Sequence, residues 1–262
     1  MQDRHVPYLA PHYWVVLSIA SVAGANTGDF VSEYLGIGHV RGLPVLVLAL
    51  VTILVMERGE FRLHTAWYWL AVLTIRTAAT NLADFLTVDL HLGRPATLAG
   101  LAVMLFAIFP MAGSEARLLM SSAMMARPPG RARPMTDAGY WSALIVASTL
   151  GTVLGDWCNV GLGLGAPHAA MLLVVLSALA LGLHITSWIS RLRLYWITIV
   201  LLLAAGTTVA DLLARDPRPQ LGLPLSTALS VGAMAISVWW WRQRTSEPSA
   251  ISKSGVSSTH RA

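Results

Sequence analysis

Long apolar blocks separated by short polar stretches dominate the pattern of this chain. The blocks lack the strict alternation of apolar and polar positions that is typical of half-buried strands. Blocks of about 20 residues are long enough to cross a hydrocarbon layer of about 30 Å as α-helix, and a helix satisfies its own backbone hydrogen bonds in lipid. The pattern predicts eight helices, at residues 12–35, 41–56, 66–90, 95–112, 138–161, 167–185, 192–214 and 224–241.

The first, third, fifth and seventh of these helices share a motif. Each begins with a Tyr-Trp pair and carries an aspartate fifteen residues after the tryptophan. The pairs are Tyr13-Trp14, Tyr68-Trp69, Tyr140-Trp141 and Tyr195-Trp196, and the aspartates are Asp29, Asp84, Asp156 and Asp211. The intervals between successive aspartates are 55, 72 and 55 residues, which indicates a two-helix unit that was duplicated twice.

The fold class that follows is an all-α, polytopic membrane protein. Its eight transmembrane helices are expected to form four parallel two-helix repeats in two tandem four-helix halves. The halves are residues 1–112 and 139–244. An Arg- and Pro-rich linker at 113–138 is expected in the cytoplasm, and the Ser-rich tail at 245–262 is expected to be disordered.

Small residues stand five positions and one position before each aspartate, which gives a small-xxx-small pattern in all four copies. Such residues let helix backbones approach closely in a membrane. We therefore expect the motif-bearing helices to pack against one another and the other four to form an outer wall. The small residues are Gly24, Gly28, Ala79, Ala83, Gly151, Gly155, Gly206 and Ala210.

A known family resembles this set of motifs. The Tyr-Trp opening, the Gly-Thr-x-x-x-Asp core at 151–156 and 206–211, and the Leu-x-Leu-Gly ending at 162–165 are similar to a family of bacterial membrane-anchored proteins defined by a repeat of unknown function. The resemblance covers about residues 12–241, and Ala25 and Ala79 break the Gly-Thr pair in the first two copies. It implies a multi-span protein of the bacterial inner membrane and supplies no substrate.

Composition supports a lipid bilayer as the main partner. Hydrophobic residues make up 55% of the chain and charged residues 12%, against about 25% in ordinary soluble domains. The net charge of +5 does not indicate a nucleic-acid partner, because the basic residues lie in loops between apolar blocks. The chain has no phosphate-binding loop or nucleophile-elbow motif, so we do not expect a soluble type of enzyme.

Lysine and arginine accumulate on the cytoplasmic side of membrane proteins. With both termini on one side, that side receives thirteen of these residues and the other side four. We therefore expect both termini in the cytoplasm. The thirteen are Arg4, Arg58, Arg62, Arg117, Arg127, Arg131, Arg133, Arg191, Arg193, Arg242, Arg244, Lys253 and Arg261, and the four are Arg41, Arg94, Arg215 and Arg218.

The repeated tryptophans, Trp14, Trp69, Trp141 and Trp196, are expected in an aromatic belt at the membrane interface, with ligand stacking as the alternative.

The repeated aspartates are the main candidates for function. Each lies about 22 Å along its helix from the tryptophan, in the outer third of a bilayer, where an ionisable group is costly. Four equal depths on helices that pack together predict one shared polar site. Oxygen ligands of this kind suit hard cations or protons, so a bound divalent cation is the one cofactor considered. Nearby candidates are Thr80, Thr152, Thr207, Asn26 and Asn81, with Glu33 at the outer mouth.

Arg76 lies eight residues before Asp84 and is the candidate counter-charge inside the membrane, either as a structural ion pair or in gating. His39, His91 and His168 fall in outer loops, where interface positions are favoured over a metal-ligand role.

The function that these features favour is a transporter or channel for a small cation. It would use a divalent metal or couple to protons through the ring of aspartates. The first alternative is a structural or binding membrane protein in which the aspartates only pin helices together. The second is a membrane-embedded enzyme that uses paired acids. The identity of the ion stays open.

Overall fold

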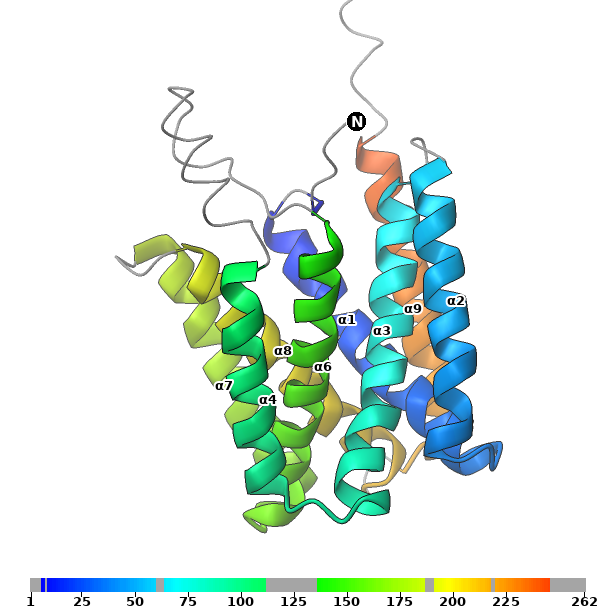
Figure 1. Cartoon of the computed structure of the whole chain (residues 1–262), viewed down its shortest axis with the longest axis vertical. Helices are drawn as coiled ribbons and strands as arrows, with labels where there is room; N and C mark the ends of the chain where they lie inside the picture. Colours follow the sequence, from blue (N-terminus) through cyan, green and yellow to red (C-terminus); the bar gives the residue numbers. More distant parts are fainter. Residues whose placement is uncertain are drawn as a thin grey trace, which may run out of the picture.

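The computed structural model describes residues 6–7, 9–59, 64–111, 136–186, 191–217 and 220–245. These residues form eight α-helices, and each predicted helix is present to within a few residues (Figure 1). Residues 112–135 and 246–262, which include most of the predicted linker and tail, lie outside the described residues, so the domain limits stay a prediction. The helices are α1 (Pro11–Asp29), α2 (His39–Gly59), α3 (His64–Asp84), α4 (Arg94–Met111), α6 (Ala138–Asp156), α7 (Gly165–Thr186), α8 (Arg191–Ala214) and α9 (Gly222–Thr245).

The four motif-bearing helices, α1, α3, α6 and α8, form a closed inner ring. Each packs on the next one along the chain, and α8 packs back on α1. They run in the same direction, with their N-terminal ends toward the top of Figure 1. The Tyr-Trp pairs therefore gather at one end of the ring and the aspartates at the other.

The outer helices interlock the repeats. Each of them packs on the inner helix of the following repeat: α2 on α3, α4 on α6 and α7 on α8. The last outer helix, α9, packs on α1 and so closes the circle. No repeat can bury its inner helix alone, because the outer helix that covers it belongs to the repeat before.

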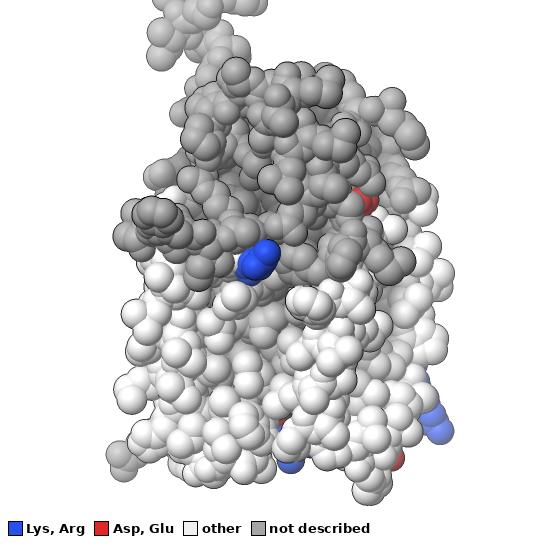
Figure 2. Space-filling view, turned by 60° about the vertical axis from the view of Figure 1, so that its left-hand side comes forward, with Lys and Arg blue, Asp and Glu red and all other residues white. Residues whose placement is uncertain are grey.

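The outside of this bundle is apolar. Large aliphatic and aromatic side chains such as Leu48, Val103, Phe106 and Ile236 are two-thirds or more exposed. Figure 2 shows one such face, on which charged side chains lie only toward the ends of the helices. Six of the described helices are long and apolar enough to cross a membrane, namely α1, α2, α6, α7, α8 and α9. The chain is thus a helical protein suited to a lipid bilayer.

The helix α3 is not among those six, although it lies in the inner ring. Arg76, Asp84 and several threonines lower its hydropathy, and most of these polar side chains are buried between helices. The apolar part of α4, Arg94–Ile108, is shorter than a full span.

Three of the inner helices do not end at their aspartate. They continue as five-residue π-helical segments: η1 (Phe30–Tyr34), η3 (Phe85–Asp89) and η4 (Trp157–Gly161). The wide turns close with i→i−5 hydrogen bonds, such as that of the Leu162 N–H to the Trp157 carbonyl at 2.7 Å. After α8 a single bond of this type joins the Asp216 N–H to the Asp211 carbonyl at 3.3 Å. Such turns are frequent at functional sites, and the sequence pattern did not indicate them.

The small residues of the motif lie between inner helices. A Cβ atom on Gly28 of α1 would approach Thr80 Cβ of α3 to 2.7 Å, and one on Gly155 of α6 would approach the Ala204 carbonyl oxygen of α8 to 2.9 Å. Real Cβ atoms do not come this close, so the helix spacing requires glycine at these positions. The three alanines of the pattern, Ala79, Ala83 and Ala210, are buried.

We predict that Gly155→Leu prevents recovery of folded protein. A leucine there must push α6 away from α8, and overpacking a tight contact costs about 1–3 kcal/mol or more. The matched control is Gly182→Leu on α7, because a Cβ at Gly182 meets nothing within 4 Å. Size-exclusion chromatography in detergent measures the folded fraction. Normal recovery of Gly155→Leu would contradict the close packing of α6 and α8.

Candidate functional site

The axis of the inner ring is built in layers, and each layer uses the same position of the four repeats. The first layer is a ring of tyrosine hydroxyls at the N-terminal ends. The O–O distances are 2.9 Å for Tyr13–Tyr68, 2.7 Å for Tyr68–Tyr140, 3.0 Å for Tyr140–Tyr195 and 2.9 Å for Tyr195–Tyr13. Each hydroxyl can donate one bond and accept another, so the buried ring satisfies itself.

The tryptophans of the Tyr-Trp pairs support this ring from outside. Each tyrosine packs on the tryptophan of a neighbouring repeat, with centroid distances of 5.4 Å for Tyr13–Trp69 and 5.8 Å for Tyr195–Trp14. The interface belt expected for Trp14, Trp69, Trp141 and Trp196 differs from this arrangement, since the last three are buried. Adjacent helix residues point about 100° apart, so a tyrosine on the axis turns its tryptophan toward the next helix. Among the described residues, the exposed tryptophans are Trp239 and Trp240 of α9.

Buried aliphatic side chains lie one turn beyond the tyrosines, on the same face of each inner helix. They are Leu17, Val72, Leu144 and Ile199, each four residues after a tyrosine. One turn further lies Arg76, which is fully buried. Its guanidinium makes no ion pair with Asp84, the partner considered from the sequence. Its hydrogen bonds go to neutral oxygens of α1, α6 and α8.

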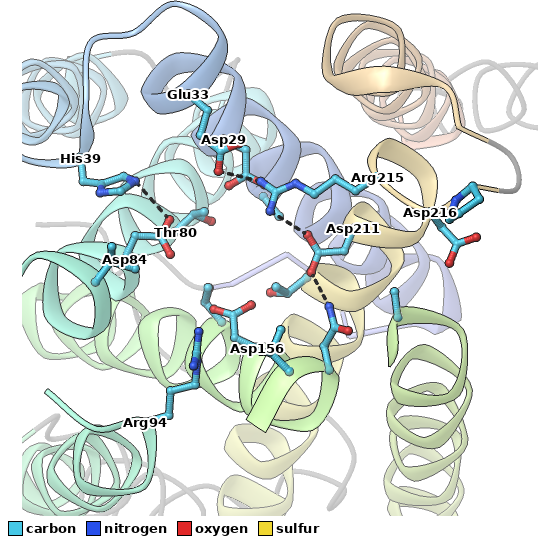
Figure 3. Close-up of a pocket in the computed structure, with 18 residues that line it drawn as sticks. Asp29, Glu33, His39, Thr80, Asp84, Arg94, Asp156, Asp211, Arg215 and Asp216 are labelled. Atoms are coloured by element: carbon cyan, nitrogen blue, oxygen red, sulfur yellow. Dashed lines mark hydrogen bonds and ion pairs between the residues drawn. The ribbon is translucent and has the colours of Figure 1, made fainter. Parts of the chain in front are cut away.

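A cavity of about 600 Å³ occupies the other end of the ring (Figure 3). All four repeated aspartates line it, one from each inner helix, together with Glu33 and the repeated threonines Thr80, Thr152 and Thr207. Asn26 and Asn81 are not among the lining residues. They are fully buried, and the Asn26 amide donates to Ser230 Oγ of α9 at 3.4 Å.

Arg215 reaches across the cavity mouth from the end of α8. Its guanidinium donates to Asp29 Oδ2 at 2.7 Å and to Glu33 Oε1 at 2.8 Å, and it lies 3.7 Å from Asp211 Oδ1. Sequence reasoning assigned Arg215 only to a loop. Its place four residues after Asp211 was the available signal, because residues at that spacing share a helix face.

Other side chains partner the remaining aspartates. His39 Nε2 lies 3.8 Å from Asp84, and its Nδ1 lies 3.1 Å from Asp89. Asn159 donates to Asp211 at 3.1 Å. Arg94 is directed toward Asp156 in Figure 3, although no ion pair within 4 Å joins these two described residues. His91 and His168, also considered from the sequence, bond backbone carbonyls instead.

The cavity carries an excess of acidic groups. Six carboxyl groups line it, from Asp29, Glu33, Asp84, Asp156, Asp211 and Asp216, against the two guanidinium groups of Arg94 and Arg215 and the imidazole of His39. With every carboxyl ionised and the imidazole neutral, six minus two leaves four negative charges. No three acidic, histidine or cysteine side chains of the described residues lie close enough together to hold one metal ion.

Arg215 stays charged in this setting. Burial by itself would lower the pKa of Arg215, but the carboxylates of Asp29, Asp211 and Glu33 outweigh burial and raise the pKa above its ordinary value. The guanidinium is therefore a permanent cation that already occupies part of the acidic mouth.

Comparison with known proteins supports the presence of the repeat and does not assign an activity to it. The model of a family described as Repeat of Unknown Function (DUF347) matches residues 139–188 and 194–245. The resemblance drawn from the sequence is thus confirmed for the two units of the second half, which are tandem copies of this repeat. No curated protein and no solved structure matches the chain.

We predict that Tyr68→Phe lowers the thermal unfolding midpoint by about 2–4 °C. The change breaks a closed ring of hydrogen bonds, and a lost buried bond costs about 1 kcal/mol. Tyr34→Phe is the control, because Tyr34 is 60% exposed and its ring stacks on that of Phe30. Equal midpoints for the two variants would show that the ring contributes nothing to stability.

Proposed function

We propose that the chain is an eight-span membrane transporter for a small cation, with Asp29, Asp84, Asp156 and Asp211 as the cation-binding or proton-coupling groups. The observation that carries this proposal is the convergence of all four repeated aspartates on one acidic cavity. Carboxylates exposed to lipid are costly, whereas a wet cavity that admits cations tolerates them. An excess of negative charge in a cleft also raises the local concentration of cations.

The closed end of the ring favours a transporter over an open channel. The tyrosine ring, the aliphatic layer and Arg76 fill the axis between the cavity and the N-terminal ends of the inner helices. A cation in the cavity would face a permanent positive charge and then an apolar layer. Passage would therefore require a second conformation in which the inner helices rearrange, as in alternating access.

The cavity suits a hydrated or otherwise bulky cation better than a bare metal ion. Its volume of about 600 Å³ has room for several water molecules. A hard ion such as Mg²⁺ often keeps several waters and touches only one or two carboxylates. Carboxyl groups that share one cavity also disfavour joint ionisation, so arrival of a cation would release protons.

Orientation completes the proposal. The thirteen-to-four division of Lys and Arg supports cytoplasmic termini in a bacterial inner membrane. The four two-helix repeats would then cross the bilayer in parallel, and the cavity would open to the side opposite the termini. The cation would enter from outside the cytoplasm in this conformation.

Reporter fusions test this topology. A fusion at Ser246 and another between residues 113 and 139 should both report the cytoplasm, because both sites lie on the side rich in arginine. A fusion between Leu90 and Gly93, in the connection after η3, serves as the opposite-side control. A periplasmic signal from either of the first two sites would contradict the eight-span arrangement.

A structural role is the second candidate, and one observation favours it. Arg215 ties α8 to α1 through Asp29 and Glu33, so some of the acidic groups hold helix ends together. Ion pairs of partly exposed side chains contribute only about 0.2–1 kcal/mol, however, and Asp156 has no such partner within 4 Å among the described residues. The lone carboxylate of Asp156 is the group that separates the two candidates.

We predict that Asp156→Asn abolishes most of the proton release that follows cation addition. The purified protein in weakly buffered detergent is mixed with MnCl₂ or MgCl₂, and a pH-sensitive dye measures the protons released. The control is Asp137→Asn, since Asp137 caps the start of α6 far from the cavity and asparagine caps equally well. Unchanged release by a folded Asp156→Asn protein would leave the structural role as the better account.

A further inference from the structure

The guanidinium of Arg76 is the point at which all four inner helices meet. Arg76 belongs to α3, and its Nε donates to Ser21 Oγ of α1 at 3.1 Å. One terminal nitrogen donates to the Ser148 carbonyl and to Thr152 Oγ1 of α6. The other donates to the Leu203 carbonyl at 2.9 Å and to Thr207 Oγ1 at 2.5 Å, both on α8. An arginine has five N–H donors, and five acceptors surround this one.

The partners of Arg76 follow from the repeat. Ser21, Ser148 and Leu203 lie 55, 72 and 127 residues from Arg76, so they hold the same position in the other three repeats. Arg76 is the longest side chain at this level of the ring. A Cβ atom on Gly24 would come to 2.5 Å from the Cβ of Arg76, so the glycine makes room for it. One repeat thus supplies a long cation, and the others supply space and acceptors.

Charge distinguishes Arg76 from an ordinary hydrogen-bond donor. All five of its partners are neutral oxygens, and no carboxylate of the described residues lies within 4 Å of it. A buried ion without a counter-ion is costly. The nearest compensating charges are the cavity aspartates. Thr152 and Thr207, which bind the guanidinium, each precede an aspartate by four residues, or about 6 Å along the helix. Thr152 and Thr207 line the cavity, so one layer of hydroxyls separates Arg76 from it.

We propose that Arg76 is a lock that closes the inner ring on the N-terminal side of the cavity, and that a cation in the cavity weakens it. The hydrogen bonds of Arg76 hold the four helices together in the closed state, while the carboxylates of the cavity compensate its charge. A cation that neutralises those carboxylates raises the free energy of the seated guanidinium. The two cations oppose each other, and by linkage the loss of the Arg76 charge must strengthen cation binding.

The binding experiment uses Arg76→Gln and Mn²⁺, whose free fraction is measured by electron paramagnetic resonance. A guanidinium and a divalent ion within about 12 Å of each other, at an effective dielectric constant of about 20, change an affinity about a hundredfold or more. Arg76→Gln should therefore bind Mn²⁺ about a hundredfold more tightly than the wild type. Arg193→Gln removes one exposed charge at the far end of α8 and should leave the affinity unchanged. Equal affinities in the wild type and Arg76→Gln would overturn the lock.

The binding experiment depends on the proposed cation site, because the lock responds to a bound cation. A second experiment therefore tests the lock separately from cation binding. Leu17 is buried and lies one turn from both Tyr13 and Ser21 on the same face of α1, on the side of Arg76 away from the cavity. Leu17→Cys in a Cys158→Ala background carries a single thiol, and its reaction with a trimethylammonium-ethyl methanethiosulfonate is followed by mass spectrometry. When Arg76→Gln is added to this parent protein, the thiol at position 17 should react at least several-fold faster.

The pair Thr152→Val and Thr207→Val should have the same effect, because it removes two acceptors of Arg76 and keeps its charge. If Arg76→Gln does not fold, the double threonine variant tests the lock in its place. A wild type that binds no Mn²⁺ would count against the proposed cation site, while faster labelling of the threonine variants would still support the lock. Labelling as slow as in the Leu17→Cys parent would overturn it.

Discussion

Four tyrosine hydroxyls can meet at one point only if the helices that carry them pack backbone against backbone. Gly24, Gly28, Gly151, Gly155 and Gly206 permit this approach, since a Cβ at any of them would overlap a neighbouring inner helix. The same spacing lets one arginine reach three other helices and places four aspartates around one cavity. Without the small residues, lipid or larger side chains would separate the inner helices, and none of these polar groups would find its partners.

The ring is symmetric in its backbone and asymmetric in its charges. Tyrosine and aspartate recur in all four repeats, whereas Arg76 occurs in the second and Arg215 only after the fourth. A strictly symmetric ring would place four guanidinium groups on the axis, and their repulsion in a low-dielectric interior would be prohibitive. Duplication therefore supplied the frame, and substitutions in single repeats supplied the charge pattern on which the proposed transport depends.

The two ends of the inner ring also differ in chemistry. Hydroxyls and aliphatic groups close one end, and carboxylates with counter-charged side chains line a hollow at the other. The offset packing of the outer helices makes this arrangement a property of the whole ring, because each repeat covers the inner helix of the next. Movement of one inner helix would change its packing against its two ring neighbours and against the outer helix of the preceding repeat.

Local patterns in the sequence were sufficient for the elements and for the repeat. Apolar blocks about as long as a membrane is thick gave the eight helices, and the fixed Tyr-Trp to aspartate spacing gave the common level of the four carboxylates. Both signals depend on the chain within one helix, where periodicity and depth can be counted directly.

The partners of each side chain were decided by the tertiary structure. Trp69 was expected at the interface and lies inside, because the rotation of its helix is set by the neighbouring helices. Arg76 was matched with Asp84 along one helix, yet its bonds go to three other helices 55 to 131 residues away. Arg215 looked like a loop residue until the fold brought α8 beside α1. Contacts between helices depend on how the helices are rotated and paired, and no pattern within a single helix specifies that.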